Sequence, residues 1–250
     1  MAQARRNWNN PRMNLLLLED TDRRDDGTWR VTGRRAEHIR RVLGLDTGDA
    51  LRAGLLNGAR GTARVRDRDA EGAVLDFEAE RAAPEPLPLR LILALPRPAM
   101  LRRTLIDATS LGIKDLVLVH SHRVEKSFWQ SPELEADKIR EKLLLGLEQA
   151  GDTLLPRVHL QRWFRPFVED ELPCFARDSR CLLAHPGDDA AMPCDLTEAV
   201  TLAIGPEGGW IDHEVDWFRE QGFACVGLGE RILKVDTALP TLVGRIMRLV

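Results

Sequence analysis

Three charged residues near the C-terminus are candidates for chemistry on a bound substrate: Glu207, Arg231 and Lys234. They lie in two glycine-bearing segments, 204–209 (IGPEGG) and 227–234 (GLGERILK). A cation beside a reacting group stabilises negative charge that develops there. Glu207 could hold its loop through backbone amides or face the substrate. Because burying an unpaired acid is costly, we expect Glu207 to be hydrogen-bonded. Considered alone, Arg231 could be an ordinary surface charge and Lys234 a solvent-exposed residue at the start of a helix. Their place in two paired glycine-bearing loops instead favours a functional site.

The first of these loops lacks the signatures of a phosphate cradle. A P-loop requires Gly-Lys-Ser/Thr after its glycines, and a dinucleotide fold requires GxGxxG at the start of a helix. Neither pattern is present here. Gly205, Gly208 and Gly209 instead permit close backbone approach, and Pro206 stiffens the turn between them. For a single loop of this kind, an ordinary tight turn is the alternative.

Short apolar runs precede both loops and predict buried strands of a parallel sheet, at residues 200–204 and 223–228. Between them, Ile211, Val215, Phe218 and Gly222 recur at helical spacing. The two loops therefore follow the carboxyl ends of parallel strands, where open α/β sheets bind their ligands.

The same alternation of strands and helices extends back to residue 89 and predicts an α/β fold with a parallel sheet. We expect Ile139, Leu143, Leu147 and Ala150 on the inner face of one long helix, and a final helix capped by Asp236 or Thr237 with Pro240 in its first turn. The predicted elements are strands 89–95, 116–120 and 180–184, a helix 100–111, a long helix from Pro132 through Ala150, and the last helix.

The N-terminal third carries many short strands and one helix, which predicts a small barrel. The helix, 35–43, should place Ile39, Val42 and Leu43 inward, and its His38 fits a surface residue. The predicted strands are 13–19, 29–32, 50–56, 62–66 and 73–80. Residues 1–12 predict a disordered tail, and the proline-rich segment 82–88 predicts a linker between domains 13–81 and 89–250.

Composition limits the class of protein. The chain has 250 residues, 44% hydrophobic and 30% charged, with a net charge of −3. We expect no membrane span and no signal peptide, and four cysteines without CxxC pairing fit a reducing cytoplasm. Any nucleic-acid footprint must be a local patch. His120 and His122 could suggest a metal pair on a strand, but with no third ligand in view we expect no metal.

The two loops also carry a family resemblance. IGPEGG, a helix, and then LGERILKVDTA resemble the RsmE-type methyltransferases, which methylate N3 of a uridine in small-subunit ribosomal RNA. That family belongs to the SPOUT class, so the resemblance implies a trefoil knot that holds S-adenosylmethionine and a homodimer formed through the C-terminal domain. Residues 38–43 followed by Gly48-Asp49 resemble the family's N-terminal PUA-like RNA-binding domain.

The resemblance implies three sets of site residues. Arg231, Lys234 and Glu207 would act in catalysis. The cofactor would contact Leu183, Ala184, His185, Ile204, Gly205, Pro206, Glu207, Gly208, Gly209, Leu228, Gly229, Ile232 and Leu233, with the loop His185-Pro186-Gly187 closing over it. RNA would contact Arg35, His38, Arg40, Arg41, Arg64, Arg66, Arg123 and Lys126. Arg64 and Arg66 alternate with Arg68, so they should share one face of a strand.

Several polar positions depart from the family pattern: Gly44, Asp107, Ser110, Val124, Asp152 and Lys234. The glycines and apolar residues of the cofactor loops are kept, while charges expected to meet RNA differ. Three alternatives to the uridine-N3 enzyme therefore stay open: a SPOUT methyltransferase with another RNA target, a non-catalytic RNA-binding ribosome-assembly factor, and a nucleotide-binding α/β enzyme.

Overall fold

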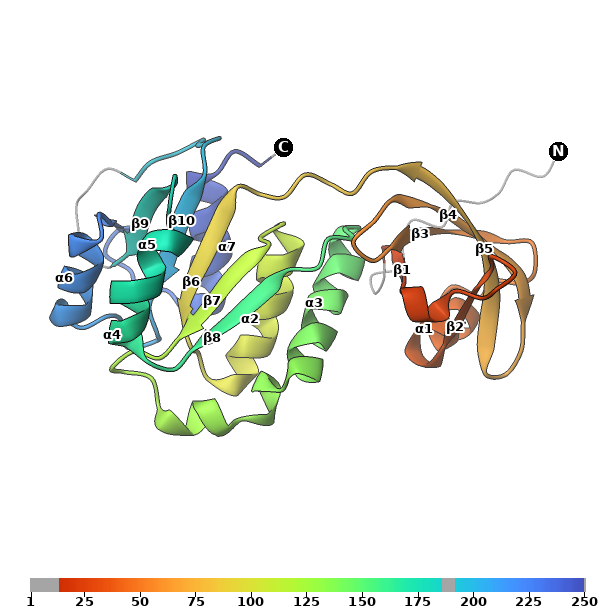
Figure 1. Cartoon of the computed structure of the whole chain (residues 1–250), viewed down its shortest axis with the longest axis horizontal. Helices are drawn as coiled ribbons and strands as arrows, with labels where there is room; N and C mark the ends of the chain where they lie inside the picture. Colours follow the sequence, from red (N-terminus) through yellow and green to blue (C-terminus); the bar gives the residue numbers. More distant parts are fainter. Residues whose placement is uncertain (1–13, 186–191, 250) are drawn as a thin grey trace. The chain divides into compact units, whose positions relative to one another are not determined.

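A computed structural model describes residues 14–185 and 192–249 and divides the chain into two compact units (Figure 1). The predicted tail 1–12 lies outside the described residues. The first unit runs to Glu85 and also includes Leu147–Leu155, and the second contains the rest. Residues 82–88 hold no helix or strand. The inclusion of 147–155 differs from the expected single domain after residue 88. It follows from backbone pairing, since Asn57 N donates to the Thr153 carbonyl at 2.7 Å.

The N-terminal unit is built on a five-stranded sheet in the order β1-β3-β4-β5-β2. β1 pairs with β3 in parallel, and the other pairs are antiparallel. Alternating apolar residues bury one face of the sheet around Trp29, Val31 and Leu75. The strands are β1 (Leu16–Leu18), β2 (Trp29–Thr32), β3 (Ala50–Leu55), β4 (Arg60–Arg68) and β5 (Gly72–Arg81).

The helix of this unit differs from its prediction. It divides into α1 (Gly33–Glu37) and a π-helical turn, His38–Val42. Ile39 is buried as expected, but the wider turn leaves Val42 39% exposed. His38 is buried rather than at the surface, and burial, followed by the charge of Arg34, lowers the pKa of its imidazole.

β4 also differs, because a bulge between Val65 and Asp67 breaks its alternation at Arg66. The prediction that Arg64, Arg66 and Arg68 share one face of the strand is therefore wrong, because the alternation does not continue across the bulge.

The C-terminal unit contains a six-stranded sheet in the order β11-β9-β10-β6-β7-β8. Every neighbouring pair in it is parallel, which confirms the predicted α/β class. β9 and β10 begin and end at the predicted residues. The strands are β6 (Leu89–Ala94), β7 (Asp115–Val119), β8 (Arg157–Gln161), β9 (Arg180–Ala184), β10 (Val200–Ile204) and β11 (Ala224–Val226).

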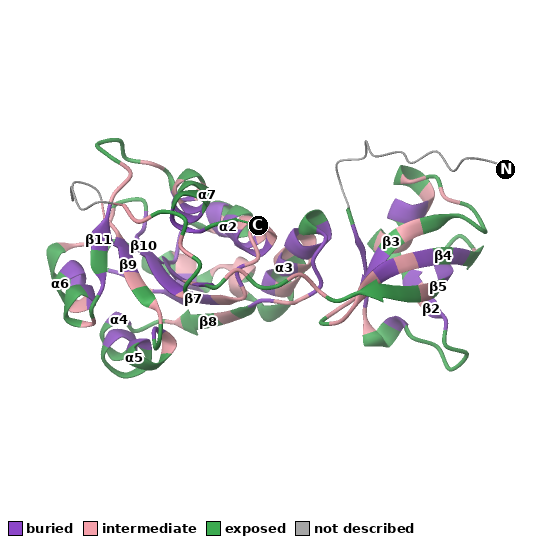
Figure 2. Ribbon diagram, turned by 90° about the horizontal axis from the view of Figure 1, so that it is seen from above, coloured by how far each residue is buried: buried purple, intermediate pink, exposed green. Residues whose placement is uncertain are grey.

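Helices cover both faces of this sheet. Figures 1 and 2 show α2 and α7 on one face and α4, α5 and α6 on the other. In residues 14–185 and 192–249, no helix is long and apolar enough to cross a membrane. The helices are α2 (Pro98–Ser110), α3 (Ala136–Ala150), α4 (Phe164–Pro166), α5 (Leu172–Phe175), α6 (Asp212–Glu220) and α7 (Val235–Ile246).

Two predicted helix starts are wrong. The long helix does not begin at Pro132, which forms a separate 3-10 turn, because Glu135 is extended with ψ 139°. At its far end Ala150 is exposed rather than inward. The last helix is capped at Lys234, so Pro240 lies inside α7 instead of in its first turn.

The apolar face of α7 is covered by its own unit. Leu239, Leu242, Val243 and Ile246 are all at most 2% exposed. These four side chains are therefore not available as a surface for a second subunit.

Candidate active site

The candidate site lies where β9, β10 and β11 end. Because these strands are parallel neighbours, the loops that follow them meet at one edge of the sheet. They enclose a cavity of about 160 Å³. Every residue predicted to contact a cofactor lines this cavity except Leu183, which is buried in β9. The sequence reasoning missed Val226, Gly227, Val235, Ala238 and Leu242, of which the last three come from α7.

The shape of the cavity wall depends on glycines in the loop after β10. A Cβ on Gly205 would lie 3.1 Å from the indole nitrogen of Trp210, which is buried beneath the loop. Gly209 has φ +75°, a left-handed conformation that L side chains rarely adopt. Its N–H closes the turn on the Pro206 carbonyl at 2.8 Å. The backbone can therefore approach a ligand closely here.

A buried carboxylate ties this loop to its neighbour. Glu214, at the start of α6, is 3% exposed. Its Oε2 accepts a hydrogen bond from Ile211 N at 3.1 Å, and its Oε1 accepts one from His122 N at 2.7 Å. Charge-assisted bonds of this kind are stronger than neutral ones. Glu214 thus positions the segment after β7 against the segment that follows the glycine loop.

His185 supplies a polar group to the same cavity. Its backbone N–H donates to the Val226 carbonyl at 3.0 Å, which fixes the end of β9 beside β11. Its Nδ1 is buried and has no hydrogen-bond partner among the described residues. A buried polar atom without a partner is costly, so this atom fits a ligand that would bond to it. Pro186 and Gly187 of the predicted loop lie outside the described residues.

A second cavity, of about 450 Å³, adjoins the first and shares Glu207, Gly208 and Val235 with it. Its remaining lining combines three cations, one acid and two apolar side chains: Arg97, Arg123, Lys234, Glu125, Met100 and Phe128. The arginines brace the glycine loop, since Arg123 Nη1 donates to the Gly208 carbonyl and Arg97 Nε lies 3.9 Å from Glu207 Oε1.

The three predicted catalytic residues divide between the cavities. Arg231 lines the first, Lys234 lines the second at the N-cap of α7, and Glu207 lines both. The Glu207 side chain is 40% exposed, so the expectation of a buried, hydrogen-bonded acid is wrong. Solvent and Arg97 together satisfy its charge.

The pair His120 and His122 does not act as a unit. His120 Nδ1 accepts a hydrogen bond from Trp129 Nε1 at 2.9 Å, and burial lowers the pKa of its imidazole. His122 is exposed. Within the part of the chain that the structure describes, no group of His, Cys, Asp and Glu could hold a metal ion.

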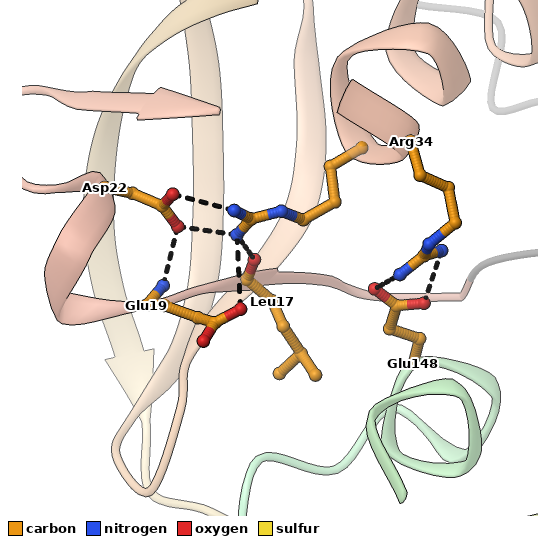
Figure 3. A network of polar contacts seen from close by, with 6 residues as sticks. Leu17, Glu19, Asp22, Arg34 and Glu148 are labelled. Carbon is orange, nitrogen blue, oxygen red and sulfur yellow. Dashed lines mark hydrogen bonds and ion pairs between the residues drawn. The ribbon is translucent and has the colours of Figure 1, made fainter. Parts of the chain in front are cut away.

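The predicted RNA-contacting Arg35 and its neighbour Arg34 are engaged in bidentate ion pairs within the N-terminal unit (Figure 3). Arg35 makes a two-pronged bond to Asp22, at 2.5 and 2.7 Å, and also donates to the Leu17 carbonyl. The adjacent Arg34 likewise donates bidentate hydrogen bonds to the carboxylate of Glu148, at 2.8 and 2.9 Å. Arg35 is only 17% exposed, so its charge is used inside the unit.

The other predicted RNA-contacting arginines make weaker or more exposed contacts than Arg35 does. Arg41 is exposed and pairs with Glu37, whereas Arg40 reaches the Ala70 carbonyl. Arg64 bonds the Gly48 carbonyl, and Arg66 lies 3.6 Å from Asp76. In the C-terminal unit, Lys126 is exposed near Arg123 in the segment after β7.

Comparisons with known proteins agree on one family. A family model for an RNA methyltransferase domain matches residues 83–247. The chain is 35% identical over 210 residues to ribosomal RNA small subunit methyltransferase E of Treponema pallidum, which covers 80% of this chain and 77% of that protein. It is 28% identical over 226 residues to the protein of the same name from Synechocystis sp., covering 87% and 71%.

The fold is shared with a solved structure. Ribosomal RNA small subunit methyltransferase E from Neisseria gonorrhoeae, bound to S-adenosyl methionine, matches with a TM-score of 0.71 at 21% identity. The match covers 92% of this chain and 95% of that one.

Proposed function

The chain belongs to the RNA methyltransferase family that includes ribosomal RNA small subunit methyltransferase E, and on that premise we propose that it methylates N3 of a uridine in small-subunit ribosomal RNA, with S-adenosylmethionine as the methyl donor. One observation carries the proposal. The glycine loop after β10 separates two adjoining cavities, one lined by three strand-end loops and the other by charged side chains of both signs and apolar side chains. Two adjoining cavities suit a reaction that brings a donor and an acceptor together.

We assign the smaller cavity to S-adenosylmethionine. Its residues fit that group, because the glycine backbone permits close approach and His185 Nδ1 is a buried polar atom with no partner among residues 14–185 and 192–249. The apolar residues Leu228, Leu233 and Leu242 suit a flat adenine ring. When bound, the cofactor supplies a methyl group on a sulfonium, so the protein needs no metal and no covalent intermediate. Positioning is then the main contribution of these loops.

We assign the larger cavity to the target base. Met100 and Phe128 provide an apolar wall against which an extruded base can stack. The N3–H of uracil is a weak acid, so the site must favour the anion. Lys234 lines this cavity and is exposed at the N-cap of α7, which makes it the group to stabilise negative charge on the base. Arg97 and Arg123 hold the wall shared with the cofactor cavity.

The family resemblance extends the proposal to finer features of the fold. We infer a trefoil knot in the segment that forms β9 to α7, and a PUA-like fold for the N-terminal unit. Support comes from the sheet order β11-β9-β10, in which the chain returns to the outer side of β9 before α7 packs beside α2. Stretching single molecules should leave a chain shorter than its full contour length. Full extension would contradict the knot.

We also propose a homodimer. Ile232, on the loop that lines the cofactor cavity, is 80% exposed although apolar, and a second subunit would cover it. Light scattering at micromolar concentration should give the mass of two chains. The mass of one chain would count against the dimer.

The proposed RNA contacts form local patches on a chain of net charge −3. Arg40 and Arg41 mark the patch of the N-terminal unit, and Arg123 and Lys126 that of the second cavity. Neutralising Arg40 and Arg41 together should weaken RNA binding and flatten its dependence on salt. An unchanged salt slope would remove this patch from the contact surface.

The function is tested by methyl transfer to small ribosomal subunits that lack the modification. Under single-turnover conditions the wild-type chain should transfer a labelled methyl group, and Lys234→Ala should be slower by roughly a hundredfold. Its affinity for S-adenosylmethionine should be unchanged. Wild-type rates in Lys234→Ala would move the role to another residue, whereas no transfer by the wild type would favour a non-catalytic RNA-binding factor.

A further inference from the structure

The edge of the sheet that carries both cavities continues past them to β8. In the order β10-β6-β7-β8 all neighbours are parallel, so the residues after each strand emerge on the same edge. Arg97 follows β6, Arg123 follows β7, and Arg162 and Trp163 follow β8 directly. From β10 to β8 there are three interstrand spacings of about 4.8 Å, roughly 14 Å in all. A few nucleotides of single-stranded RNA can span that distance.

Trp163 stands out on this edge. It is 75% exposed, more than any other tryptophan or phenylalanine in residues 14–185 and 192–249. An exposed indole of this kind forgoes the stabilisation that burial of so large an apolar side chain provides. The position therefore calls for a ligand with a flat face.

The backbone around Trp163 is anchored on both sides. The guanidinium of Arg162 lies over the Trp129 ring, 5.5 Å from its centroid, and donates to the Trp129 carbonyl at 3.4 Å. Phe164 is buried and packs against Phe218 and Trp210, with ring centroids 5.6 and 5.9 Å apart. The indole is consequently presented from a fixed segment, which lowers the entropic cost of binding a ligand.

Two arginines lie beside Trp163 in the chain. Arg162 and Arg165 flank it, and both are exposed. Arg165 lies 6.0 Å from the Trp217 ring centroid and pairs with Glu169 at 2.7 Å, which raises the pKa of its guanidinium. A flat aromatic ring between arginines is the arrangement by which proteins bind unpaired nucleotides, with the base stacked on the ring and the phosphates near the cations.

We propose that Trp163 is a stacking platform for an unpaired base that lies a few nucleotides from the methylated uridine, and that Arg162 and Arg165 contact the adjoining phosphates. This inference rests on the proposed function, since it runs the substrate RNA along the edge that holds both cavities. It makes the segment that follows β8 part of the RNA-binding surface.

The test uses the full chain, a labelled single-stranded oligoribonucleotide and unmodified small ribosomal subunits. Trp163→Ala should weaken binding to both by roughly ten- to a hundredfold, the usual effect of removing one stacking side chain. Trp163→Phe should bind nearly as the wild type does, because a ring remains. Leu160→Ala is the matched control: Leu160 is 41% exposed on β8, before the segment that carries Trp163, and it offers no flat face, so this substitution should leave binding unchanged.

Three further readouts separate stacking from other roles. In the methyl-transfer assay Trp163→Ala should raise KM for the subunits and leave kcat and S-adenosylmethionine affinity unchanged. Arg162→Ala with Arg165→Ala should reduce the salt slope of binding, which Trp163→Ala should not. RNA binding by Trp163→Ala at wild-type strength overturns the proposal. So does a lower mass of that variant in light scattering, which would make the indole a contact between copies.

The experiments distinguish failure of the proposed methyltransferase function from failure of the stacking proposal. Binding to the oligoribonucleotide needs no methyl transfer, so the stacking test gives a result even if the wild-type chain transfers nothing. Conversely, active transfer combined with unchanged binding by Trp163→Ala would remove only the platform.

Discussion

At the scale of single residues, whether an arginine is available to bind RNA depends on the residue with which it forms an ion pair. Arg35 and Arg41 lie on the same short helical segment, and both were predicted to contact RNA. Arg35 is bonded to Asp22, which is 8% exposed, whereas Arg41 is 69% exposed in an i,i+4 pair with Glu37. Breaking a buried pair leaves an uncompensated charge, while exposed pairs contribute little.

We therefore expect Arg35→Ala to destabilise the N-terminal unit by roughly 3–5 kcal/mol. Arg41→Ala, the matched control, should change stability by less than about 0.5 kcal/mol. Chemical denaturation of the two variants measures the difference. Equal stability of both would show that the Asp22 pair does not hold the unit together.

Glycine conformation gives a second prediction at this scale. Alanine at Gly209 must adopt φ +75°, which costs about 1–2 kcal/mol, and the strain distorts the wall between the cavities. Gly209→Ala should weaken S-adenosylmethionine binding roughly tenfold or more by calorimetry. Gly244→Ala, on open space in α7, should leave affinity unchanged. An unaltered affinity for Gly209→Ala would place the cofactor elsewhere.

At the scale of elements, apolar runs were the reliable signal. β10 is buried along its length and apolar apart from Thr201, and β9 has buried leucines at its centre, so the ends of both strands and the loops after them could be predicted from sequence. β8 was missed because its residues are mostly exposed and polar, and no run marks it. The Arg35–Asp22 pair was missed for another reason, since a partner in a separate turn of the chain leaves no pattern in sequence.

The junction of α2 and α7 carries a repulsive pair. Burial, and then the charge of Asp236, raises the pKa of Asp107. Arg103 Nη1 lies 3.8 Å from Asp236 Oδ2 and is 71% exposed, so it screens the pair only partly. A carboxyl whose pKa is raised on folding binds its proton more tightly in the folded state. Wild-type stability is therefore lost as pH rises from about 3.9 through the folded pKa.

Asp107→Asn should accordingly raise the melting temperature at neutral pH, with a gain of up to about 1 kcal/mol. The gain should vanish as the pH falls below about 3.9, where Asp107 is protonated in both states. Asp216→Asn, an exposed carboxylate on α6, is the control and should show no such gain. Thermal unfolding across pH measures this. A lower melting temperature for Asp107→Asn at neutral pH would contradict the repulsion.

At the scale of the whole molecule, the resemblance rather than periodicity implied the knot, the dimer and the RNA target. Periodicity placed strands and loops, and all the predicted cofactor residues except Leu183 line one cavity in the structure. The structure also places Arg231 and Lys234 in different cavities. Nothing in their closeness along the chain indicated this difference. The second cavity could not be predicted from sequence, because its lining comes from the start of α2, from the segments after β7 and β10, and from the start of α7.

The most direct test maps methylated nucleosides in ribosomal RNA. Small-subunit RNA from a strain lacking this gene should lose one N3-methyluridine, and incubating its subunits with the purified chain and S-adenosylmethionine should restore that nucleoside at the same position. Mass spectrometry of the digested RNA reports both changes. If N3-methyluridine persists in the deletion strain, or if the chain restores a methyl group on another atom or another RNA, the assigned reaction is wrong.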